Sequence, residues 1–135
     1  MVVHSPDAPS FPSILSQGRV CGNLLFTSGL VPMSPGEHDV CPGGITEQTR
    51  LVLENLGHVL KAAGSSLRHV LKVTVFLADM ADYRAMNDEY RRFFAPPLPA
   101  RSCVAVKALA LPAMRVELEA VAEIPGADGG SRAQR

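Results

Sequence analysis

The sequence predicts an α+β fold, a β-β-α-β-α-β-β sheet with two helices on one face, from three observations. Apolar residues recur at steps of three and four over residues 45–63, as on one face of a helix. Residues 69–78 are strongly apolar, which is typical of a central strand covered on both faces. Residues 116–122 mostly alternate between apolar and acidic side chains, as in a strand with one buried face. One sheet with both helices on one face is the simplest arrangement that buries these surfaces.

The N-terminal part of the chain is expected to supply an arm and two strands. Residues 1–12 contain three prolines, which block regular structure and predict an extended arm. Strands are predicted at 15–21 and 23–30, separated by a turn at Gly22 and Asn23.

The two helices have recognisable starts and stops. A loop rich in proline and glycine, residues 32–44, precedes the first helix, and Gly64 stands where a helix ends in a left-handed residue. Asp79 can cap the second helix, which is expected to run to about Phe94, before a proline-rich turn.

The C-terminal part is expected to add two strands, at about 101–108 and 114–123. Residues 1–124 are therefore predicted to form a single domain. The small and polar segment 125–135 is predicted to be a disordered tail.

Composition excludes several classes of protein. Acidic and basic residues balance at 13 each, so no long-range field attracts a polyanion, and nucleic-acid binding is not expected. The three cysteines have no Cys-x-x-Cys spacing, which favours a reducing compartment such as the cytoplasm. We expect neither a signal peptide nor a membrane-spanning segment.

Candidate chemistry lies on the last two strands. Alternation places Arg101 and Cys103 on one face of their strand. If the helices cover the apolar face of the last strand, Arg101, Cys103 and Glu117 meet on the opposite face. A guanidinium fork matches a carboxylate, and a carboxylate such as Glu117 can polarise a water molecule. Such a pair is enough to bind a small acid and hydrate a carbon–nitrogen double bond.

Each candidate also has an ordinary structural interpretation. Arg101 can form a surface ion pair, Glu117 can lie on a solvated strand face, and Cys103 can be an inert buried thiol. Asn87 can be a buried amide and Ser28 simply a strand end. The four histidines lack the spacing of metal ligands, so no metal site is expected.

The face of the sheet away from the helices needs a cover of its own. We expect it to carry Cys103, Ala105 and Val121, which are too apolar for a solvated surface. Packing of sheet against sheet in an oligomer would bury them.

Many short motifs, in order over about residues 8–124, resemble the Rid family, also called YjgF. The C-terminal signature is Pro99-Ala100-Arg101-Ser102-Cys103-Val104, then Leu111-Pro112, then Val116-Glu117-Leu118-Glu119-Ala120-Val121-Ala122. The upstream motifs are Gln17-Gly18, Thr27-Ser28-Gly29, Gly44-Ile45-Thr46-Glu47-Gln48-Thr49, Asn55-Leu56, Ala62-Ala63-Gly64, the run from Lys72 to Met80, Asn87 and Tyr90.

The resemblance implies a chorismate-mutase-like fold and a homotrimer with a central barrel and three clefts between subunits. It implies hydrolysis of reactive 2-imino or enamine acids, such as 2-aminoacrylate, to 2-keto acids and ammonia, without metal or organic cofactor. The residue matching Arg101 would bind the substrate carboxylate, and the one matching Glu117 would position the attacking water. The residues matching Ser28, Gly29, Asn87 and Cys103 would lie in or near the cleft.

The sequence departs from the family pattern at three places. Leu15 stands where the family has a tyrosine that helps to wall the cleft, and Leu30 stands in place of a frequent glutamine. The linker from Val106 to Val116 also differs in length. We expect a more apolar pocket and a different substrate.

The sequence is compatible with four functions. The leading hypothesis is a 2-imino-acid deaminase, and the others are a noncatalytic carboxylate-binding regulatory trimer, a ribonuclease or translation inhibitor, and a pathway-specific enzyme for a bulkier imine.

Overall fold

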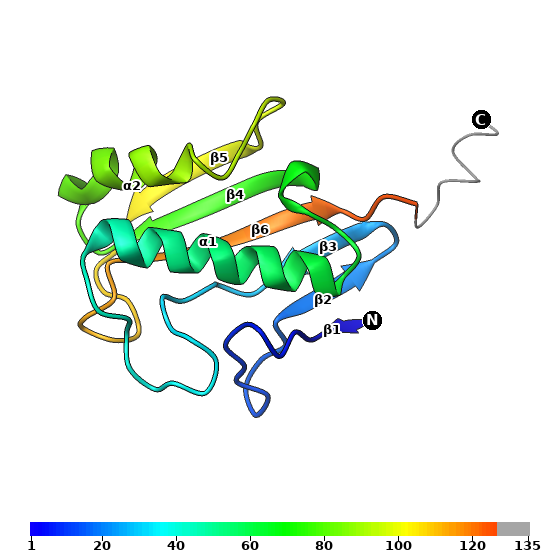
Figure 1. The fold of residues 1–135 in the computed structure, drawn as a ribbon, viewed down its shortest axis with the longest axis horizontal. Coiled ribbons are helices and arrows are strands. Elements are labelled where there is room, and N and C mark those ends of the chain that lie inside the picture. Colours follow the sequence, from blue (N-terminus) through cyan, green and yellow to red (C-terminus); the bar gives the residue numbers. More distant parts are fainter. Residues whose placement is uncertain (127–135) are drawn as a thin grey trace.

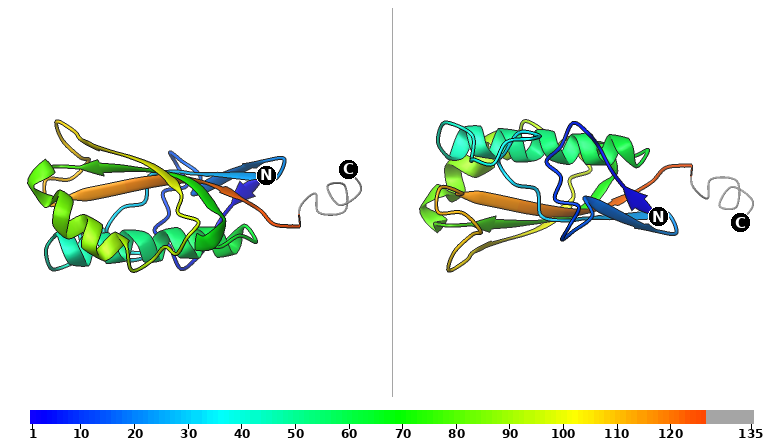
Figure 2. Two further views of the ribbon diagram at one scale, coloured as in Figure 1. Left: turned by 90° about the horizontal axis from the view of Figure 1, so that it is seen from above. Right: turned by 90° about the horizontal axis from the view of Figure 1, so that it is seen from below.

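A single six-stranded sheet carries both α-helices on one face, as Figures 1 and 2 show for the computed structural model, which describes residues 1–126. The predicted α+β class is confirmed. The strands are β1 Val2–Val3, β2 Gly18–Cys21, β3 Leu24–Thr27, β4 Val70–Leu77, β5 Ala100–Ala105 and β6 Val116–Glu123. The helices are α1 Ile45–Ala62 and α2 Tyr83–Tyr90, with 3-10 turns η1 Leu67–His69 and η2 Met80–Asp82.

The sheet order is β1-β2-β3-β6-β4-β5. All neighbouring pairs are antiparallel except β4 and β5, which are parallel. Parallel neighbours need a crossover connection, and α2 supplies it between β4 and β5. β5 is therefore an edge strand, and β6 is placed between β3 and β4 (Figure 1).

The predicted elements are present with shorter bounds. The N-terminal arm adds the short strand β1, in which Val2 pairs with Arg19. The α2 helix ends at Tyr90 rather than at Phe94. As predicted, Asp79 caps the chain that leads into α2, because its carboxylate accepts a hydrogen bond from the Ala81 amide, and Gly64 has a φ of 80°.

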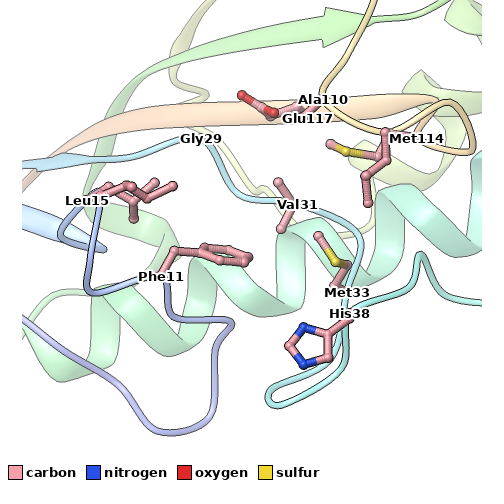
Figure 3. A pocket seen from close by; sticks show the side chains of 11 residues that line it. Phe11, Leu15, Gly29, Val31, Met33, His38, Ala110, Met114 and Glu117 are labelled. Atoms are coloured by element: carbon pink, nitrogen blue, oxygen red, sulfur yellow. The ribbon is translucent and has the colours of Figure 1, made fainter.

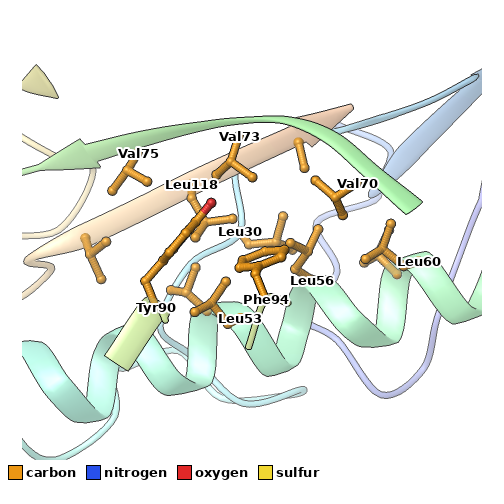
Figure 4. Close-up of a cluster of buried hydrophobic side chains, with 14 of the residues drawn as sticks. Leu30, Leu53, Leu56, Leu60, Val70, Val73, Val75, Tyr90, Phe94 and Leu118 are labelled. Atoms are coloured by element: carbon orange, nitrogen blue, oxygen red, sulfur yellow. The ribbon is translucent and has the colours of Figure 1, made fainter. Parts of the chain in front are cut away.

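The core lies between α1 and the sheet, as Figure 4 shows. The apolar stripe of α1 is fully buried against β4 and β6, and Tyr90 and Phe94 close the core at the end of α2. Its fully buried members include Val52, Leu53, Leu56, Leu60, Val73, Val75 and Val116.

The other face of the sheet has no cover within the described chain. Its apolar residues include Phe26 and Val104, which are 45% and 44% exposed. The prediction that Cys103 and Ala105 lie on this face is wrong, because they pair with the buried Val75 and Leu77 on the helix side. Exposed apolar area of this kind is typical of an interface, and the predicted trimer stays a prediction.

No helix within residues 1–126 is both long and apolar enough to cross a membrane. The predicted disordered tail lies mostly outside the described chain: Pro125 and Gly126 are exposed, and residues 127–135 are not described.

Candidate active site

Arg101 lies on the helix-covered side of the sheet. It pairs with the buried Val73, and its guanidinium carbon lies 4.8 Å from the ring centroid of Tyr90. Its Nη2 donates a 3.4 Å hydrogen bond to the hydroxyl of Tyr83. The predicted common face for Arg101, Cys103 and Glu117 is therefore wrong, because Glu117 pairs with Phe76 and points to the opposite side.

The Arg101 site is a cavity of about 360 Å³ between α2 and the start of β5, lined by Tyr83, Asn87, Tyr90, Arg91, Leu98, Pro99 and Arg101. No carboxylate of residues 1–126 forms an ion pair with Arg101, and no hydrogen bond of that part of the chain uses the Asn87 amide. Both groups are therefore available to a ligand. An aromatic face holds a guanidinium flat without neutralising its charge, which leaves the fork free for an anion.

Cys103 lies one pleat further along β5 and packs against the core. Burial raises the pKa of its thiol, and the charge of Arg101 offsets this only in part. Because the thiolate is the reactive form, a raised pKa makes Cys103 a poor nucleophile. The inert thiol is the interpretation that fits.

The second candidate catalytic residue, Glu117, lies on β6, and its carboxylate packs against the backbone of Gly29. A Cβ atom at Gly29 would lie 2.7 Å from Cδ of Glu117, so only glycine leaves room for the carboxylate there. Burial, followed by the negative charge of Glu119, raises the pKa of Glu117. Within residues 1–126 this carboxylate has neither a hydrogen bond nor an ion pair, so its basic oxygens are free to bind water.

The Glu117 pocket is a cavity of about 400 Å³ shown in Figure 3. The segment between β1 and β2, the loop after β3, the loop before β6 and the start of β6 contribute its lining. The lining residues are Phe11, Ile14, Leu15, Gly29, Val31, Met33, His38, Ala110, Leu111, Met114 and Glu117. The walls are almost entirely apolar, and the carboxylate of Glu117 lies at one edge (Figure 3).

Leu15 lines this pocket, whereas Leu30 does not. Leu30 is 5% exposed in the core, where its backbone bridges to Leu118. The Ser28 hydroxyl donates a 2.6 Å hydrogen bond to the Ser16 carbonyl, so it holds the arm against the sheet.

Three buried amide side chains fix the three segments of the pocket. Gln17 bonds to backbone atoms of Ser5, Ala8 and Pro9 in the arm. Asn55 of α1 donates to the carbonyls of Val31 and Met33, both at 3.0 Å. Gln48 of α1 donates to the Ala113 carbonyl and accepts from the Arg115 amide. The pocket is therefore preformed, because α1 holds two of its loops and Gln17, the residue before β2, holds the arm.

Sequence reasoning missed several members of both sites. Phe11, Met33, His38 and Met114 come from loops whose mutual positions no local pattern reveals. Tyr83 and Tyr90 could have been predicted as site residues. They are seven residues apart, so they share a helix face with Asn87, which lies between them in the sequence. Among residues 1–126, no group of three or more His, Cys, Asp or Glu side chains is placed to hold a metal ion.

Comparison with known proteins defines the class. Residues 7–124 match the model of a family described as Endoribonuclease L-PSP. The chain belongs to this family, which is the Rid family that the sequence motifs resemble.

Curated relatives and solved structures agree with this assignment. A RutC family protein of Pyrococcus horikoshii is 41% identical over 90% of this chain and 95% of its own length. A rat protein named 2-iminobutanoate/2-iminopropanoate deaminase is 37% identical over 90% of this chain and 88% of its own.

Among solved structures, a putative endoribonuclease of Thermotoga maritima superposes with a TM-score of 0.87 at 40% identity, covering 93% of this chain and 98% of its own. Escherichia coli TdcF with bound serine gives a TM-score of 0.84 at 35% identity, covering 91% and 98%.

Proposed function

We propose that this protein hydrolyses reactive 2-imino and enamine acids to 2-keto acids and ammonia. Rat, mouse and goat relatives that are 37–39% identical carry the name 2-iminobutanoate/2-iminopropanoate deaminase. The observation that carries the proposal is the Glu117 carboxylate, which is partly buried, has no hydrogen bond or ion pair within residues 1–126, and lines a pocket. Such a group is placed to bind and polarise water.

The proposed active site combines two protomers. Within one chain Arg101 and Glu117 lie on opposite faces of the sheet, in two separate cavities. A second copy that packs on the uncovered sheet face can bring its Arg101 site to the Glu117 pocket. The homotrimer implied by the family motifs, with clefts between subunits, supplies that geometry.

Substrate binding begins at Arg101. Its planar fork accepts the carboxylate of the imino acid in a bidentate arrangement, and the ring of Tyr90 beneath it fixes the orientation. The structure of TdcF with bound serine supports an amino-acid-like carboxylate as the ligand.

Hydrolysis then proceeds through one water molecule. Glu117 accepts a proton from the water as the water oxygen bonds to the imine carbon, and it passes this proton to the nitrogen, which gives a neutral carbinolamine. Glu117 then takes the proton of the new hydroxyl group and delivers it to the nitrogen as the carbon–nitrogen bond breaks, so that ammonia leaves as the carbonyl forms. An enamine first takes up a proton on carbon and loses one from nitrogen to become the imine. Every atom comes from substrate and water, so the scheme uses no cofactor.

The test follows keto-acid release from a freshly generated imine. We expect the wild-type protein to accelerate release, and both Arg101→Ala and Glu117→Gln to lower kcat/KM by at least about 100-fold. Unchanged rates in these variants would refute the proposal. Tight binding of keto acids without any deamination would identify a noncatalytic carboxylate-binding protein instead.

A ribonuclease remains the second candidate because the family description names one. RNA is not the expected ligand, because acidic and basic residues balance and the chain has no excess of positive charge to bind phosphates. RNA cleavage that survives repurification and disappears in Arg101→Ala would favour it.

We place the protein in the cytoplasm, because its three cysteines are free thiols.

A further inference from the structure

The Glu117 pocket is larger and more apolar than a small imino acid needs. We infer that it receives the side chain of a bulky apolar 2-imino acid, of the size of those derived from leucine, methionine or phenylalanine. This inference rests on the proposed function and specifies its substrate class.

Polarity argues for an apolar occupant. Of the lining residues within 1–126, only Glu117 and His38 can ionise, and the walls are formed by aliphatic, thioether and phenyl side chains. Leu15 is 37% exposed although it faces this cavity, so an apolar occupant would remove it from water. A polar side chain would lose its hydration there and find few hydrogen-bond partners.

Size argues in the same direction. At about 400 Å³ the cavity falls within the range of pockets that hold small organic molecules. The methyl group of an alanine-derived imine would leave most of this space to water. A branched or aromatic side chain would fill it and gain the corresponding contacts.

The position of Glu117 determines how the substrate is oriented in the pocket. Its carboxylate lies at one edge of the cavity, beside the backbone of Gly29 (Figure 3). An imine carbon beside this carboxylate places the side chain over Leu15, Val31 and Met33. The carboxylate of the substrate then points away from the pocket, toward the Arg101 site of the neighbouring protomer.

Preorganisation makes the pocket selective. Gln17, Asn55 and Gln48 hold its three segments through hydrogen bonds of 2.6–3.1 Å. A pocket held in this way does not collapse around a smaller side chain, so it loses contacts when the substrate is short.

The experiment compares kcat/KM for imines generated from alanine and from leucine or phenylalanine. We expect the bulky imines to be favoured by roughly tenfold or more, because each methylene in a fitted pocket contributes about that factor. Leu15→Asn should lower kcat/KM for the bulky imine more than for the small one. Val2→Asn, which changes a 62% exposed apolar side chain on β1 outside the pocket, should leave the ratio unchanged.

The outcomes separate the inference from the proposed function. A preference for the alanine-derived imine, or a ratio that Leu15→Asn does not move, would overturn the inference while the deaminase proposal stands. If no imine is hydrolysed, the deaminase proposal fails, and calorimetry with pyruvate and 4-methyl-2-oxopentanoate still decides the pocket. Tighter binding of the larger keto acid that Leu15→Asn abolishes would support an apolar side-chain pocket, and equal affinities would rule it out.

Discussion

A single glycine decides where the Glu117 carboxylate lies. The Cβ of Gly29→Ala would come within 2.7 Å of Glu117 Cδ, and the flexible glutamate would have to swing away. We expect kcat/KM for imine hydrolysis to fall by roughly 10- to 100-fold, because small displacements of a reacting group are costly. Thermal unfolding should change little, since a side chain rather than the backbone gives way.

The matched control is Gly57→Ala, in the middle of α1. A Cβ there meets no heavy atom within 4 Å, so activity should be retained. Stability should rise by about 0.5–1 kcal/mol, because alanine is the better helix former. Equal activity losses in both variants would contradict the role given to Gly29.

The ionisation of Glu117 should be visible in the pH profile. Burial and the charge of Glu119 raise the pKa of Glu117, and the water-binding form is the carboxylate. Activity is therefore lost as the pH falls through this raised pKa. Glu119→Gln removes the neighbouring negative charge, lowers the pKa of Glu117, and should move the acid limb of kcat/KM to lower pH.

The control for this shift is Glu54→Gln on the exposed side of α1, which should leave the acid limb in place. An acid limb that moves to higher pH in Glu119→Gln, or not at all, would show that another group titrates.

At the scale of elements, buried amides on α1 and just before β2 hold the loops of the pocket. Replacing Gln17 by leucine leaves several buried backbone groups of the arm without partners. Each costs about 1–3 kcal/mol, so urea unfolding at fixed protein concentration should show a loss of at least about 2 kcal/mol.

Asn23→Leu serves as the comparison, because the Asn23 amide makes one long hydrogen bond of 3.4 Å to Glu123. We expect it to cost less than about 1 kcal/mol. A Gln17→Leu variant no less stable than Asn23→Leu would show that the arm is held by other contacts.

The elements themselves could be predicted from local patterns, but the faces of the edge strand could not. The stripe of α1 and the alternation of β6 are unambiguous because each has one clearly apolar side. The β5 sequence from Arg101 to Ala105 has no such contrast, and alternation alone says which residues share a face, not which face it is. Only its pairing with β4 placed Arg101 beneath α2.

The sequence motifs predicted three residues of the candidate site but not the shape of its pocket. Arg101, Gly29 and Glu117 stand in recognisable motifs. The pocket, in contrast, joins Leu15, Val31 and Met114, which are far apart along the chain and meet only through the folded loops. No short-range pattern contains that information.

At the scale of the whole molecule, Arg101 and Glu117 lie on opposite faces of one sheet, and neither has an ion-pair partner within residues 1–126. One copy of the chain therefore offers two half-sites, and the exposed Phe26 and Val104 mark a surface over which copies can pack. We expect light scattering coupled to size-exclusion chromatography to show a trimer. A monomer at micromolar concentration would contradict the shared site.

The most direct test mixes two inactive variants. Arg101→Ala and Glu117→Gln subunits are unfolded together, refolded, and assayed for imine hydrolysis beside each variant refolded alone. If sites form between protomers, random trimers contain interfaces with both residues intact, and about a quarter of the wild-type activity should return. Mixed trimers that remain as inactive as the separate variants would show that Arg101 and Glu117 do not act across an interface.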